Sequence, residues 1–98
     1  MSAKESEFQS SLIKRIHSEF PEAIVMKNDS GYLQGVPDLT ILNDANWAAL
    51  EVKKSKSSKH QPNQDYYVKM MDGMSYAAFV DPENVEEVMD ALQRTLRA

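Results

Sequence analysis

Cysteine is absent from this sequence of 98 residues, which excludes both disulfide bonds and thiolate metal ligands. No apolar run is long enough to cross a bilayer. Residues 1–8 are polar and lack the apolar core of a signal peptide. An excess of basic residues is also missing: the net charge is −4, whereas a typical non-specific DNA binder is basic. We therefore expect a soluble cytoplasmic protein with no membrane segment, and the total charge counts mildly against nucleic-acid binding.

The composition is that of an ordinary globular protein, with 42% hydrophobic and 27% charged residues. Its length suits one compact domain spanning residues 1–98. The charge is distributed unevenly, because four lysines cluster in the middle of the chain and acidic residues follow in the C-terminal part. A local basic patch steers an anion even when the whole chain is acidic. A solvated loop explains the same lysine cluster equally well.

Hydrophobic periodicity predicts three helices and four strands. The expected helices are 8–20, 62–73 and 82–96, and the expected strands are 23–26, 38–42, 47–53 and 76–80. Pro21 ends the first helix, Pro62 and Pro82 suit the first turns of the other two, and Gly73 is placed to end the second. Asp81 is expected at the N-cap of the last helix. The resulting αβββαβα order predicts an α/β fold with a mixed central sheet flanked by helices.

The third expected strand carries a charged pair at its end. Side chains alternate faces along a strand, so Trp47, Ala49, Glu51 and Lys53 share one face. If residues 43–46 connect the second and third strands as a hairpin, Asp38 lies near Glu51. Two carboxylates with a lysine beside them suit a hard cation such as Mg²⁺, and the lysine can orient a nucleophile or stabilise charge on a phosphate. A local Glu51–Lys53 ion pair is the simpler alternative.

These residues resemble the PD-(D/E)XK nuclease superfamily. The segments that carry the resemblance are Gly35-Val36-Pro37-Asp38-Leu39, Leu50-Glu51-Val52-Lys53 and Gln64. They look most like the small VRR-NUC-like members from phages and bacteria, which are similar in fold and size to Holliday-junction resolvases. The resemblance implies a restriction-endonuclease-like α/β fold.

Roles for five residues follow from the resemblance. Asp38 and Glu51 would ligate Mg²⁺ or Mn²⁺, together with the backbone carbonyl of Val52. Lys53 would be the catalytic lysine. Gln64 would point into the active site from the start of its helix, with a surface glutamine as the alternative.

The resemblance also implies an acid on the first helix that binds a second metal ion. We prefer Glu5, which lies near the inward stripe containing Phe8, over Glu7, which is rotated by about 100 degrees from Phe8. The alternative for Glu5 is a charge that is stabilised by the helix dipole. The residues expected to contact DNA lie in the lysine-rich segment and are Lys54, Lys56, Lys59 and His60.

The function implied is a metal-dependent DNA endonuclease of a bacterial or phage-infected cell, selective for branched or junction DNA by analogy with the resolvases. One chain of this size presents one site, so cutting two strands predicts a homodimer. The Met70-Met71-Met74 cluster and Trp47 are candidates for its interface, with core packing as the alternative. A non-catalytic DNA- or protein-binding module on the same fold is the alternative function, and a small α/β interaction domain is a third.

Overall fold

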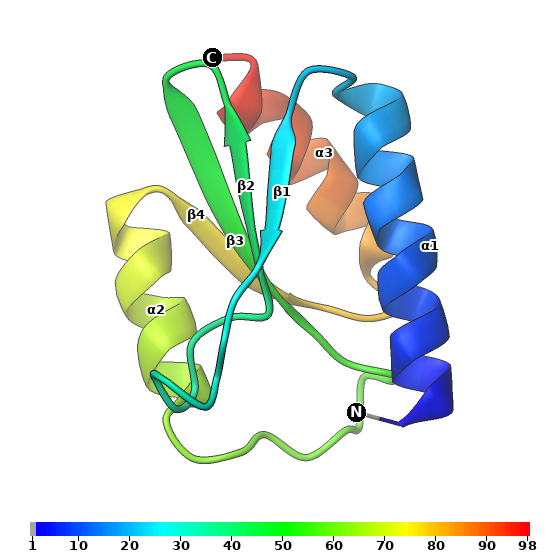
Figure 1. The fold of residues 1–98 in the computed structure, drawn as a ribbon, viewed down its shortest axis with the longest axis vertical. Coiled ribbons are helices and arrows are strands. Elements are labelled where there is room, and N and C mark those ends of the chain that lie inside the picture. The colour runs from blue at the N-terminus through cyan, green and yellow to red at the C-terminus, as the bar shows by residue number, and fades with distance from the viewer. Residues whose placement is uncertain (1) are drawn as a thin grey trace.

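The computed structural model describes residues 2–98, which form three helices and one four-stranded sheet in the predicted αβββαβα order (Figure 1). The elements are α1 (Ala3–Glu19), β1 (Ile24–Lys27), β2 (Leu39–Asn43), β3 (Asn46–Val52), α2 (Gln64–Met74), β4 (Tyr76–Val80) and α3 (Val85–Leu96). The predicted strands match these bounds to within about one residue at each end. The α/β class and the element order are therefore confirmed.

The sheet is mixed, and its strands lie in the order β1-β2-β3-β4. β1 pairs with β2 and β2 with β3 in antiparallel directions, whereas β3 and β4 are parallel. Asp44 takes a positive φ of 53° in the tight connection between β2 and β3, a conformation that Asp tolerates better than most residues. The β2–β3 register pairs Leu39 with Leu50. Consequently Asp38, one residue before β2, lies beside Glu51 near the end of β3.

Helices cover both faces of the sheet (Figure 1). On one face, the apolar stripes of α1 and α3 pack against Leu50 and its neighbours, forming the larger core. The side chains in this core include Leu12, Ile16, Ala48, Leu50, Val52, Val88, Met89, Leu92 and Leu96. On the other face, α2 contributes Val68 to a smaller cluster with Ala49 and Ala77. The predicted alternation along β3 is thus confirmed.

The predicted starts of all three helices differ from the structure. α1 begins at Ala3, five residues earlier than expected, because Ser2 caps it by accepting the backbone N–H of Glu5. The other two helices begin two or three residues later than expected. α2 begins at Gln64, with Asn63 as its N-cap, because residues 61–64 form a turn and Pro62 lies inside it. It also continues through Gly73 to Met74.

In the last helix, the predicted N-cap Asp81 instead accepts hydrogen bonds from the backbone N–H groups of Glu83 and Asn84. The Asn84 side chain accepts one from the N–H of Asp81 in return. This reciprocal pair closes a turn before the helix, so α3 begins at Val85 rather than at Pro82.

Within residues 2–98, no helix combines the length and the apolar character needed to span a membrane.

Candidate active site

The segment leading into β2 places Asp38 against the end of β3. Asn28 fixes this segment, because its side-chain N–H₂ donates to the carbonyl of Pro37 at 2.9 Å and to Thr40 Oγ1 at 2.8 Å. One carboxylate oxygen of Asp38 then accepts the backbone N–H of Val52 at 2.9 Å. The carboxylate of Asp38 is held by the neighbouring strand through this contact and points toward the residues that follow Leu50.

Glu51, Lys53 and Gln64 form one hydrogen-bonded cluster. The Gln64 side-chain N–H₂ donates to Glu51 Oε2 at 2.9 Å, and Gln64 Oε1 accepts from Lys53 Nζ at 2.7 Å. Lys53 Nζ lies 3.8 Å from Glu51 Oε2 and also donates to the carbonyl of Lys59 at 3.1 Å. Gln64 Oε1 is further held by the backbone N–H of Gln61 at 2.8 Å. The amide of Gln64 therefore holds Glu51, at the end of β3, and Lys53, just after it, in fixed positions.

Glu51 is buried in an environment that disfavours its charge. The residue is 3% exposed, and its Oε1 has no hydrogen-bond partner among residues 2–98. Burial, and after it the negative charge of Asp38, raise the pKa of Glu51 to about 8, although Lys53 acts in the opposite direction. A buried carboxylate oxygen without a partner costs free energy unless a proton or a cation neutralises it. A proton on Glu51, which Asp38 can accept as a hydrogen bond, or a bound cation would provide this neutralisation.

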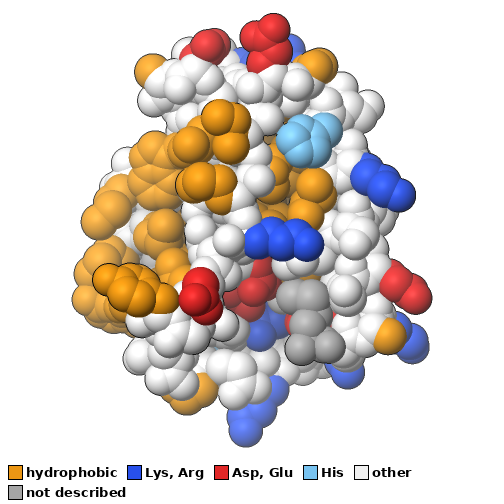
Figure 2. All heavy atoms as spheres, in the orientation of Figure 1, with side chains coloured by type: hydrophobic (Ala, Val, Ile, Leu, Met, Phe, Trp, Pro, Cys, Tyr) orange, Lys and Arg blue, Asp and Glu red, His pale blue; other side chains and the backbone are white. Residues whose placement is uncertain are grey.

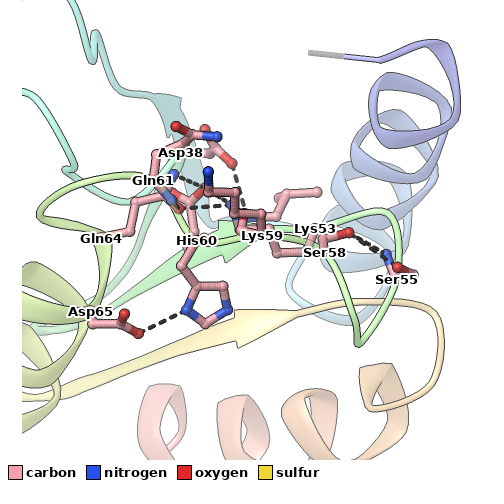
Figure 3. Close-up of polar contacts among 11 residues, drawn as sticks. Asp38, Lys53, Ser55, Ser58, Lys59, His60, Gln61, Gln64 and Asp65 are labelled. Carbon is pink, nitrogen blue, oxygen red and sulfur yellow. Dashed lines mark hydrogen bonds and ion pairs between the residues drawn. The ribbon is translucent and has the colours of Figure 1, made fainter.

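A pocket of about 510 Å³ opens over this cluster. Asp38, Glu51, Lys53 and Gln64 all line it, and so does Glu5 from the first helix. Its other lining residues are Ser2, Ser30, Lys54, Ser58, Lys59 and Gln61. Figure 3 shows Asp38, Gln61, Gln64 and the lysines converging from the sheet, the loop before α2 and the start of α2. The chain therefore gathers acidic, basic and amide groups at one end of the β2–β3 hairpin.

The donor set of this pocket fits a hard cation. Carboxylate oxygens are the ligands that Mg²⁺ prefers, and it commonly binds through one or two carboxylates while keeping several waters. Asp38 and Glu51 provide two, and the partnerless Oε1 of Glu51 is a free acceptor. Residues 2–98 contain no cluster of three or more His, Cys, Asp or Glu side chains within reach of one ion. The roles of Glu5 and of the Val52 carbonyl as ligands stay predictions.

The four residues expected to contact DNA do not lie together. Lys54 and Lys59 line the pocket, whereas Lys56 lines a separate hollow with Asp81, Glu83, Asn84 and Glu87. The ring of His60 points away from Asp38: it bonds to Asp65 Oδ1 at 2.8 Å and stacks on Phe79 with ring centroids 3.9 Å apart (Figure 3). Two of the four residues are thus placed with the acidic cluster.

Sequence reasoning missed several groups of the site. The backbone N–H of Gln61 and the carbonyl of Lys59 hold Gln64 and Lys53, but backbone groups leave no mark in a residue pattern. Ser30 lines the pocket from the loop between β1 and β2, to which the motifs assign no role. A signal was available for Gln61, because it lies three residues before Gln64 in a predicted loop–helix junction.

The structure therefore defines an α/β protein whose mixed sheet carries an acid–lysine–amide pocket at the end of its central hairpin. The fold is similar to that of a solved protein described as a VRR_NUC domain protein. The superposition has a TM-score of 0.67 and covers 99% of this chain and 91% of the other, with 17% sequence identity. This likeness confirms the α/β fold with a mixed sheet, in the form shared with a VRR_NUC domain protein. Comparison with protein-family profiles and with curated protein sequences gives no match.

Proposed function

We propose that this chain is a metal-dependent endonuclease that hydrolyses phosphodiester bonds in DNA. The observation that carries the proposal is the convergence of Asp38, Glu51, Lys53 and Gln64 in one pocket, where a buried oxygen of Glu51 has no hydrogen-bond partner among residues 2–98. The shared fold with a VRR_NUC domain protein supports it. A local Glu51–Lys53 ion pair, the simpler alternative, would not require Asp38 beside it.

In this proposal Asp38 and Glu51 hold Mg²⁺ or Mn²⁺. The chemistry that such an ion supplies when bound is activation of water and polarisation of the phosphate. Glu51 would hold the ion as a carboxylate, and the ion would then neutralise its buried charge. Val52 would contribute its carbonyl, and Glu5, which lines the pocket, would hold a second ion.

Lys53 acts on the substrate side of the pocket. Its ammonium group has three N–H donors, of which two go to Gln64 Oε1 and to the carbonyl of Lys59. The third is available to orient the attacking water or to stabilise charge on the phosphate. Gln64 is a positioning residue, since it holds Lys53 and Glu51 without needing to touch the reacting atoms. Lys54 and Lys59 supply positive charge for neighbouring phosphates.

A cleavage assay tests the proposal. Labelled duplex, single-stranded, flap and four-way-junction DNA are incubated with Mg²⁺, with Mn²⁺ or with EDTA. Wild-type protein should cut at least one substrate in a metal-dependent manner. Lys53→Ala and Asp38→Asn should lower the rate by at least about 100-fold, while circular dichroism shows a folded protein.

Lys56→Ala is the matched control, because it removes the same charge from a hollow outside the pocket. Its rate should stay within a few-fold of wild type. If Lys53→Ala cleaves DNA at the wild-type rate, the assigned site is wrong. If no DNA is cut but DNA is bound, the non-catalytic binding module becomes the better description.

We also propose that the working form is a homodimer, since two strands require two sites. Of the predicted interface residues, Met70 and Met74 are 41% and 67% exposed, whereas Trp47 and Met71 are half-buried and pack against the smaller core cluster. Figure 2 shows hydrophobic side chains gathered on the side of the molecule where α2 lies. Light scattering should give twice the chain mass of 11.1 kDa, and Met74→Glu should reduce it to that of one chain.

A further inference from the structure

The loop between β1 and Asp38 is held in one conformation. Near its start, the backbone carbonyl of Asp29 accepts the N–H groups of Tyr32 and Leu33, and the Asp29 side chain accepts that of Gly31 at 2.8 Å. Near its end, Gly35 has a φ of +92°, and a Cβ atom there would lie 2.5 Å from the Cβ of Asn63. The loop is therefore folded on itself and packed against the start of α2.

This ordered loop presents an aromatic ring to solvent. Tyr32 is 89% exposed, the largest exposed fraction among the large hydrophobic side chains of residues 2–98, and Leu33 beside it is 40% exposed. Burying such a ring would contribute about 1.5–3 kcal/mol to stability, so its exposure forgoes that contribution. Because the ring contributes no burial energy to this chain, its whole face is available for contact with another molecule.

The same loop forms part of the pocket wall. Ser30 and Asp38, on either side of Tyr32 in the sequence, both line the pocket, and Lys54 and Lys59 line it as well. Nucleic-acid surfaces that accept unpaired strands combine positive charge along the backbone with aromatic rings on which bases stack. The loop that follows β3 supplies the positive charge inside the pocket, and the β1–β2 loop, which forms part of the pocket wall, carries the exposed ring of Tyr32.

We propose that Tyr32 stacks on an unpaired base next to the scissile phosphate and makes this protein selective for DNA with unpaired nucleotides. The inference rests on the proposed nuclease function and names its substrate class. In a duplex each base is already stacked on its neighbours, so the face of the Tyr32 ring finds no free base. Leu33 extends the apolar contact at the tip of the loop.

Binding without metal tests the stacking directly, because EDTA prevents cleavage. The probes are a gapped DNA with 2-aminopurine at the unpaired position and a fully paired duplex of the same length. Wild-type protein should bind the gapped DNA more tightly and quench the 2-aminopurine fluorescence. Tyr32→Ala should lose about 5- to 100-fold in affinity for the gapped DNA, with little change for the duplex.

Two further variants make this test specific. Tyr32→Phe keeps the ring and should keep both the preference and the quenching. Tyr66→Ala is the matched control, because Tyr66 is also exposed, at 56%, but stands on α2 in an edge-on contact with Tyr67. It should behave like wild type.

The proposal is overturned if wild type prefers neither DNA, if Tyr32→Ala keeps the preference, or if it weakens both DNAs equally. If Tyr32→Ala changes the mass measured by light scattering but keeps the preference for gapped DNA, the ring belongs to a protein contact instead. Cleavage is read separately. Metal-dependent cutting by wild type with an unchanged preference in Tyr32→Ala refutes only the stacking role. If Tyr32→Ala loses the preference for gapped DNA but wild type cuts no DNA, only the proposed nuclease function is refuted.

Discussion

Replacing Glu51 with glutamine should stabilise the protein when metal is absent, and the gain should depend on pH. The folded-state pKa of Glu51 is about 8, against an ordinary value of 4.5, because burial and the charge of Asp38 disfavour the carboxylate. Between these two pH values the folded protein binds more protons than the unfolded chain. The stability contributed by this group is therefore fully present below pH 4.5 and is lost as the pH rises through about 8.

The size of the effect follows from the same two values. The loss corresponds to roughly 3 kcal/mol at pH 7 and on the order of 5 kcal/mol above pH 8. In Glu51→Gln no charge is buried, and the new side-chain oxygen can still accept the N–H₂ of Gln64. The new N–H₂ group would face Asp38, where wild type has an oxygen without a partner. For a domain of this size, we expect Tm to rise by about 10 °C or more at pH 8 and by a few degrees at pH 5.

Thermal unfolding followed by circular dichroism in EDTA, at intervals from pH 5 to 9, measures this difference. Glu7→Gln is the control, because it removes an exposed acid from α1 and should leave the pH dependence of Tm unchanged. A Tm difference between wild type and Glu51→Gln that is constant with pH, or a less stable variant at pH 8, would refute the reasoning. Adding Mg²⁺ or Mn²⁺ should then raise the Tm of wild type but not that of Glu51→Gln.

Three further outcomes are expected. Gly35→Ala should destabilise the protein by at least about 2 kcal/mol in urea titrations, because a Cβ at φ +92° would overlap Asn63; wild-type stability would show that the loop shifts freely. Asn28→Ala should lower the free energy of unfolding by about 1–3 kcal/mol and reduce the cleavage rate, because the carbonyl of Pro37 and the segment before β2 are then no longer held. An unchanged cleavage rate would contradict this. At limiting metal, the cleavage rate should rise from pH 6 to about 8 as Glu51 loses its proton, and a flat profile would argue against Glu51 as a ligand.

The sequence predicted the parts of the site that depend on local periodicity. Alternation along a strand places Glu51 and Lys53 on the face of Trp47 and Ala49, and the structure puts that face against α2. A short hairpin connection brings Asp38 next to Glu51 whatever the rest of the fold does, because the register follows from the connection. These two rules suffice to gather the acids and the lysine.

Features that depend on contacts distant in sequence could not be predicted in this way. Pro82 was expected to open the last helix, but the reciprocal bonds between Asp81 and Asn84 close a turn first. His60 belongs to the lysine-rich segment by sequence, yet its ring stacks on Phe79 of β4. Composition suggested a shared role for that whole segment, whereas tertiary packing divides its residues between the pocket and other surfaces.

The contact between Gly35 and Asn63 shows how residues without chemistry position residues that have it. Asn63 takes a φ of +69°, which ends the preceding turn and lets α2 begin at Gln64. Gly35 fits against Asn63 only because it has no Cβ, and the same loop ends in Asp38 three residues later. One close backbone contact therefore sets the position of the amide that holds Glu51 relative to the carboxylate beside it. A side chain at position 35 would move Asp38 away from Gln64. The loss of activity would then exceed what the loss of stability alone explains.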